Sequence, residues 1–120
     1  MKGTILALAA GLVAVALAAS ASAMSANRLV GSTGPDSAFN ITLKKGKTKV
    51  TRLKHGRYTI VVKDIATTHN FHLVGPGVNK KTGIASKGTV TWHVTLKKGK
   101  YTYRCDIHFT SGMKGSFKVV

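Results

Sequence analysis

The sequence predicts an all-β domain, a two-sheet sandwich or barrel of about seven short strands. Apolar and polar residues alternate with a period of two over most of the chain after Ala26, which is typical of antiparallel strands with one buried face. Turns that contain glycine separate these segments about every 8–12 residues, as in small sandwiches. The chain after residue 26 has no convincing helical periodicity.

Five segments carry the alternation, and we expect their apolar side chains to face the core. In chain order, these side chains are Phe39, Ile41 and Leu43; Tyr58, Ile60 and Val62; Val90, Trp92, Val94 and Leu96; Tyr101 and Tyr103; and Phe117 and Val119. The third segment is the clearest, because Thr91, His93 and Thr95 fill the positions between its apolar residues. Each segment is therefore predicted to be a half-buried strand.

Glycine marks the reversals between these strands, where a tight turn or a positive φ is needed. Residues 24–36 contain Gly31, Gly34 and Pro35, which disfavour regular structure, so they are predicted to be a flexible lead-in. The folded domain is then expected to span residues 37–120, with no linker or repeat dividing it. The expected turns are Lys45-Gly46-Lys47, His55-Gly56-Arg57, Gly75-Pro76-Gly77 and Lys98-Gly99-Lys100.

Residues 1–23 have the pattern of a secretory signal peptide. Lys2 gives a positive start, Ile5 to Ala18 are apolar, and Ala21-Ser22-Ala23 fits the small-x-small pattern of a signal-peptidase site. The apolar run is short for a membrane span, which needs about 20 apolar residues, although an uncleaved anchor is the alternative. We expect cleavage to leave an exported domain without a transmembrane segment, in the periplasm, at the cell surface or outside the cell.

The single cysteine, Cys105, has no intramolecular partner, which is unusual in an exported chain because free thiols oxidise there. It is buried and inert, it forms an intermolecular disulfide, or a metal occupies its sulfur. The spacing C-x2-H-x4-M joins it to His108 and Met113. A thiolate, an imidazole and a thioether suit copper in both oxidation states, and a second imidazole from another strand would complete a His2Cys plane. This segment therefore indicates a copper site.

Two short segments also carry a resemblance to a known family. One is the pair His69-Asn70, and the other is a run of spaced residues near the end of the chain. That run consists of Gly99, Tyr101, Tyr103, Cys105, His108, Met113 and Gly115. In these residues the chain resembles the cupredoxins, closest to the plastocyanin and pseudoazurin type, over roughly residues 39–120. The resemblance implies a Greek-key sandwich, one mononuclear type 1 (blue) copper ion and one-electron transfer between Cu(I) and Cu(II).

The family pattern also implies which residues hold the metal. Asn70 would tie the two ligand-bearing loops together through hydrogen bonds. Ile107 departs from the pattern, because many relatives have proline before the second histidine, but the change removes no ligand. The implied ligands are His69, Cys105, His108 and Met113.

The choice of His69 over His72 depends on strand geometry and on the family pattern. His69 shares a predicted strand face with Phe71 and Leu73, which look core-directed, whereas His72 points to the opposite face. His69 also precedes Asn70, as the pattern requires. We expect His72 to be an exposed strand residue, and a partner-facing group or an extra donor to the metal are the alternatives. The other two histidines, His55 and His93, are expected to take no part in the site.

The net charge of the chain indicates what kind of partner it binds. The chain has 19 Lys and Arg against 3 Asp and Glu, a formal net charge of +16. Such a charge attracts anionic partners over a long range and makes binding salt-dependent, although solvation of loops is the simpler role for many lysines. Export argues against nucleic acid, so the expected partner is an acidic redox protein or an anionic cell-surface component. The domain is expected to be a monomer.

These features predict an exported electron carrier that is not an enzyme and has no catalytic residues. A copper module for storage or delivery and a metal-free β-sandwich interaction domain are the alternatives. A thiol enzyme is disfavoured, because no acid or amide is placed to orient His108 as a base for Cys105. Copper oxidases with related folds need more histidines than the five in this chain.

Overall fold

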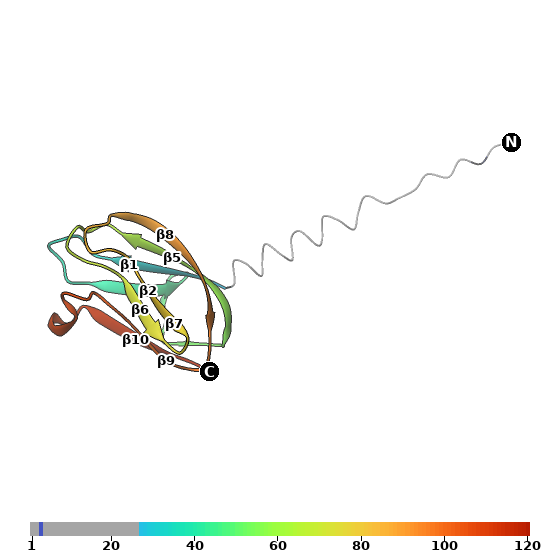
Figure 1. Cartoon of the computed structure of the whole chain (residues 1–120). Helices are drawn as coiled ribbons and strands as arrows, with labels where there is room; N and C mark the ends of the chain where they lie inside the picture. Colours follow the sequence, from blue (N-terminus) through green and yellow to red (C-terminus); the bar gives the residue numbers. More distant parts are fainter. Residues whose placement is uncertain (1–2, 4–26) are drawn as a thin grey trace.

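A computed structural model describes residue 3 and residues 27–120, and residues 28–119 form a sandwich of two five-stranded β-sheets (Figure 1). The signal peptide predicted for residues 1–23 lies outside the described residues, apart from residue 3. The strands are β1 (Arg28–Thr33), β2 (Ile41–Lys45), β3 (Thr48–Lys49), β4 (Arg52–Leu53), β5 (Gly56–Asp64), β6 (His72–Gly75), β7 (Val78–Lys81), β8 (Gly88–Leu96), β9 (Gly99–Arg104) and β10 (Lys114–Val119).

The two-sheet, all-β architecture confirms the predicted fold class, although the described residues form ten strands rather than about seven. One sheet has the order β3-β2-β1-β5-β8 and the other β4-β10-β9-β6-β7. The chain repeatedly crosses between the sheets, so β5 and β8 pair directly although β6 and β7 lie between them in sequence. A single 3-10 turn, η1 (Phe109–Ser111), interrupts the strands, and no helix in the described part of the chain could cross a membrane.

The prediction of a flexible lead-in over residues 24–36 is wrong for residues 28–33, which form β1. This strand pairs with β2 on one side and with β5 on the other, and its Leu29 is fully buried. Gly31 does not break this strand and has a packing role instead. A Cβ atom there would lie 2.7 Å from Cζ of Phe71, so glycine lets the aromatic ring approach the strand.

The predicted alternation is confirmed in most strands, because one face of each strand lies between the two sheets. Ile60 and Val62 of β5 and Leu96 of β8 are fully buried, as are the two tyrosines of β9. Val90 was predicted to face the core, yet 42% of it is exposed. It lies in the first half of β8, an edge strand whose first five residues are exposed or half-buried.

We expect Tyr101→Phe to lower the free energy of unfolding by about 1–3 kcal/mol. The buried hydroxyl of Tyr101 accepts a hydrogen bond from Lys97 N–H (2.9 Å) and lies within bonding distance of Pro76 O (2.9 Å). Phenylalanine leaves both groups without this partner. Urea denaturation measures the effect, with Tyr58→Phe as the control. The Tyr58 hydroxyl makes one hydrogen bond, to Lys54 O (2.8 Å), so a larger loss in the control would contradict the argument.

Candidate metal centre

Two loops at one end of the sandwich bring His69, Cys105 and His108 together. His69 lies just before β6, Cys105 follows β9 directly, and His108 precedes η1. Cys105 Sγ is 3.9 Å from His69 Nδ1 and 3.7 Å from His108 Nδ1, and the two Nδ1 atoms are 3.0 Å apart. Three of the four residues that the sequence predicted as ligands therefore meet at one point.

These separations fit three ligands around one metal ion. In zinc sites, metal–nitrogen bonds are about 2.0–2.1 Å long and metal–sulfur bonds about 2.3 Å. In a trigonal arrangement, bonds of these lengths separate two nitrogen ligands by about 3.5 Å and a nitrogen from a sulfur ligand by about 3.8 Å. The sulfur–nitrogen separations agree closely, and the nitrogen–nitrogen separation is somewhat shorter. With a thiolate and two imidazoles as donors, the cluster fits a type 1 copper site.

The loop between β1 and β2 sets the tautomer of His69. Nε2 of His69 lies 3.1 Å from both Pro35 O and Ala38 O. Because carbonyl oxygens only accept hydrogen bonds, Nε2 carries the hydrogen and Nδ1 keeps its lone pair. That lone pair belongs to the nitrogen nearer Cys105 Sγ, so the backbone carbonyls prepare His69 to bind a metal through Nδ1.

Asp36 fixes this loop to the segment before His69. Its carboxylate accepts hydrogen bonds from the hydroxyl and the backbone N–H of both Thr67 and Thr68, over 2.6–3.1 Å. The bonds from Thr67, its hydroxyl first, and those from Thr68 lower the pKa of Asp36 to about 2. This role of Asp36 was not predicted from the sequence. Asp36 is one of only three acidic residues, and that scarcity was the available signal.

Phe39 covers the imidazole of His108. The prediction that Phe39 faces the core is wrong, because it lies before β2 and 51% of it is exposed. Its ring stacks on that of His108, with the centroids 4.2 Å apart and an angle of 17° between the planes. His108 itself is half-buried, whereas His69 and Cys105 are fully buried. His108 is therefore the ligand candidate closest to solvent.

Met113 lies in the same loop and is fully buried. Its N–H donates to His108 O (3.2 Å), and its carbonyl oxygen accepts from Cys105 N–H (3.1 Å). Gly112, at φ 91°, makes the left-handed turn that returns the chain from η1 to β10. These backbone bonds hold the three loop residues in a closed turn, and the axial role of Met113 stays a prediction.

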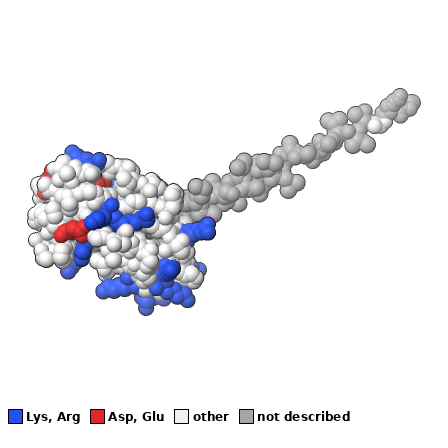
Figure 2. All heavy atoms as spheres, in the orientation of Figure 1, with Lys and Arg blue, Asp and Glu red and all other residues white. Residues whose placement is uncertain are grey.

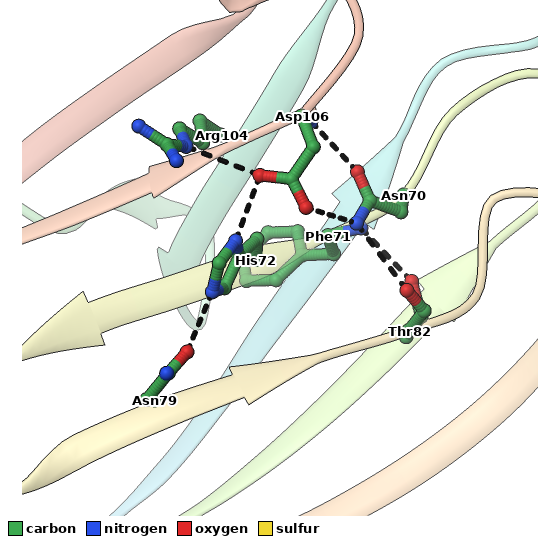
Figure 3. A network of polar contacts seen from close by, with 7 residues as sticks. All are labelled: Asn70, Phe71, His72, Asn79, Thr82, Arg104 and Asp106. Carbon is green, nitrogen blue, oxygen red and sulfur yellow. Dashed lines mark hydrogen bonds and ion pairs between the residues drawn. The ribbon is translucent and has the colours of Figure 1, made fainter.

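Asn70 joins the two ligand-bearing loops, as Figure 3 shows. Its Oδ1 accepts a hydrogen bond from Asp106 N–H (2.8 Å), and its Nδ2 donates to Asp106 Oδ2 (2.9 Å) and to Thr82 O (3.3 Å). These are the cross-loop bonds that the sequence analysis expected of Asn70. Each loop residue that they join is a direct neighbour of a ligand candidate, since Asn70 follows His69 and Asp106 follows Cys105.

The prediction that His72 is an exposed strand residue is wrong. Its Nδ1 is 2.7 Å from Asp106 Oδ1, its Nε2 is 2.6 Å from Asn79 Oδ1, and only 12% of its side chain is exposed (Figure 3). Burial raises the pKa of Asp106, but hydrogen bonds from His72, Asn70 and Arg104 outweigh that effect, and its pKa is lowered. His72 thus supports the loop through Asp106 and lies outside the His69–Cys105–His108 cluster.

No protein-family model and no curated protein matches the sequence. Solved structures are similar in fold. Dithionite-reduced auracyanin from the photosynthetic bacterium Roseiflexus castenholzii has a TM-score of 0.57 at 19% identity, over 78% of this chain and 97% of that chain. Rusticyanin from Thiobacillus ferrooxidans has a TM-score of 0.53 at 20% identity, over 78% and 76%.

A multi-copper oxidase from Pediococcus acidilactici also matches, with a TM-score of 0.51 at 20% identity, over 78% of this chain and 25% of the oxidase. All of these identities are low, so the likeness concerns the arrangement of the strands. Auracyanin and rusticyanin are cupredoxins, and each aligns over most of its own length. This chain therefore has the cupredoxin fold that its two short sequence motifs predicted.

Proposed function

We propose that this protein is an exported type 1 copper protein that carries single electrons. The observation that carries the proposal is the cluster itself: one thiol and two imidazole Nδ1 atoms meet at separations that suit one metal ion. The fold supports it, because rusticyanin, one of the similar structures, is a copper protein. Export rests on the sequence pattern of residues 1–23.

The proposed ligands are His69 Nδ1, Cys105 Sγ and His108 Nδ1, with the thioether of Met113 as a weak fourth donor. Bound copper would supply one-electron exchange between Cu(I) and Cu(II). The protein keeps the donors in place: the carbonyls of the β1–β2 loop hold His69, and the Asn70–Asp106 bonds hold the Cys105 loop. A site held in this way rearranges little when the charge of the metal changes.

His108 gives the proposed electron route to the surface. It is half-buried, and its ring contacts the exposed ring of Phe39, while Ile107 beside it is 54% exposed. A partner that covers these apolar side chains would come close to a metal ligand without entering the buried centre. The proposal is a carrier with one buried centre, and it assigns no catalytic residue.

Adding one equivalent of Cu(II) to the purified protein is expected to produce an intense blue absorption band that ascorbate bleaches. Voltammetry should then show a reversible one-electron couple with fast exchange. His93→Ala is the control, because His93 is exposed on β8 and its side chain makes one hydrogen bond within the described residues, to Thr59 Oγ1 at 3.3 Å. A faint band typical of ordinary tetragonal Cu(II) would contradict the proposal. Ready transfer of Cu(I) to an acceptor, without a reversible couple, would instead favour a delivery module.

A further inference from the structure

Most basic side chains lie at the end of the sandwich opposite the His69–Cys105–His108 cluster. The cluster adjoins the end of β9 and the start of β10, so the far end holds the start of β9, the end of β10 and the turns around residues 46, 55 and 97. Twelve basic residues lie in these turns and adjoining strand ends: Arg28, Lys44, Lys45, Lys47, Lys49, Arg52, Lys54, Arg57, Lys97, Lys98, Lys100 and Lys118.

The acidic residues lie at the other end. Asp36 and Asp106 belong to loops of the metal centre, and Asp64 is the last residue of β5. The half of the domain with the metal centre carries six basic side chains and these three acids, a net charge of +3. The far half carries twelve basic side chains and no acidic one, a net charge of +12. In Figure 2 the red atoms lie on the left, the side of η1, whereas blue atoms appear on several sides and gather most densely along the lower edge. The charge is thus strongly polarised along the domain.

The cations of the far end also converge on a concave surface. A hollow of about 540 Å³ is lined by Lys45, Arg52, Lys54 and His55, together with Asn27 and neighbouring residues. Both salt bridges among the described residues use Asp106, so neither neutralises a lysine of this end. Cations gathered in this way repel one another, and an anionic partner relieves that repulsion.

We propose that this end docks on a bilayer surface that carries anionic phospholipid headgroups, with their phosphate groups facing the hollow. We call the docking surface the basic pole and define it as Lys45, Lys47, Arg52, Lys54, Arg57, Lys97 and Lys98. The metal centre then faces away from the bilayer and stays open to a soluble partner. The proposal rests on the charge arrangement and is independent of the proposed electron transfer.

A lipid surface fits the basic pole better than an acidic protein does. Protein interfaces have an apolar and aromatic centre, whereas lysines alone suffice to bind an anionic bilayer. Of the exposed large hydrophobic residues, Phe39, Ile65 and Ile107 lie in loops at the metal end. The others, Val74 and Val90, lie within strands outside the pole. Leu53 and Tyr58 line the hollow but are only 6% exposed, so the basic pole offers no exposed large apolar residue to a protein partner.

The chain also enters the folded domain at the basic pole. Asn27 Nδ2 donates to Arg57 O (2.9 Å), and Thr59 N–H donates to Asn27 O (3.0 Å). The 26 residues before Asn27, which include the apolar run Ile5 to Ala18, therefore join the domain on this side. A chain held in a membrane by that run would have the basic pole as the end of the domain nearest the membrane.

The test is co-sedimentation of the full-length protein with phosphatidylcholine vesicles, with and without phosphatidylglycerol. We expect binding to the anionic vesicles only, with an affinity that falls steeply as salt is added. The pole variant Lys45→Gln/Lys47→Gln/Lys54→Gln/Lys98→Gln should bind several hundredfold more weakly, at about fivefold for each lysine. The matched control, which removes the same charge from the other half, should bind almost as well as the wild type. It is Lys63→Gln/Lys80→Gln/Lys81→Gln/Lys87→Gln.

Three results would overturn the proposal. Equal losses in both quadruple variants would show that net charge alone drives binding. Equal binding to neutral vesicles would assign it to the apolar N-terminal run. Binding to polyglutamate without binding to anionic vesicles would point to an acidic protein partner.

Discussion

Cys105→Ser is expected to abolish the intense blue band that Cu(II) gives with the wild-type protein. The band requires a thiolate bound to copper, and Cys105 is the only cysteine in the chain. A serine hydroxyl stays protonated at neutral pH and is a harder, poorer donor. The two Nδ1 atoms remain, so weak Cu(II) binding with a faint band is expected. Visible absorption during a Cu(II) titration measures the loss.

Two control variants show whether that loss is specific to the thiolate. Met113→Leu conserves the volume of a buried side chain and removes only the thioether that we propose as a weak axial donor, so the blue band should persist with an altered reduction potential. His93→Ala removes an exposed imidazole far from the cluster and should leave both unchanged. An intense band in Cys105→Ser would exclude a thiolate ligand. Loss of the band in His93→Ala would place the copper elsewhere.

The features that the sequence predicted well depend on local spacing. Alternation predicted the buried faces of β5 and β9, because a period of two is a property of consecutive residues. Cys105 and His108 also lie within one short loop, so their spacing alone indicated convergence. His69 lies 36 residues from Cys105, so spacing alone could not identify it. Its place before Asn70 in the family pattern and the core-facing pattern of Phe71 and Leu73 together indicated it.

The features that the sequence could not predict depend on contacts between distant segments. Phe39 looked like the first core residue of a strand, but β2 begins two residues later and the ring stacks on His108 instead. His72 looked exposed, because nothing in its own segment shows that Asp106 lies beside it, 34 residues away. Gly31 looked like a strand breaker until the ring of Phe71 was seen against it.

The net charge of +16 was plain from composition, but its arrangement was not. The direction of each strand decides that arrangement. A lysine beside a turn lies at the end of the sandwich where that turn is, and the direction of the strand determines which end that is. The turns at residues 46, 55 and 97 all fall at the same end. Composition therefore predicted an anionic partner but not the surface of the domain that would bind it.

Asn70→Ala is expected to lower the free energy of unfolding by about 3–4 kcal/mol and to weaken copper binding about 10–100-fold. Asn70 is 1% exposed, and its amide makes three hydrogen bonds across the two loops. Alanine leaves Asp106 N–H and Thr82 O without this partner in a region with little water. It also frees the loop that carries Cys105, so part of the binding energy of the metal would be used to order that loop.

The comparison with Asn79→Ala separates this role from a general loss of hydrogen bonds. Asn79 is exposed and contacts the same network from outside, through His72 Nε2 (2.6 Å), so its loss should cost less than about 1 kcal/mol. Urea denaturation of the metal-free protein and a copper competition titration measure the two effects independently. If Asn70→Ala lost stability but kept the wild-type copper affinity, Asn70 would support the fold without positioning the ligands. A parallel loss of both would show that the bonds from Asn70 to Asp106 keep Cys105 in place beside His69.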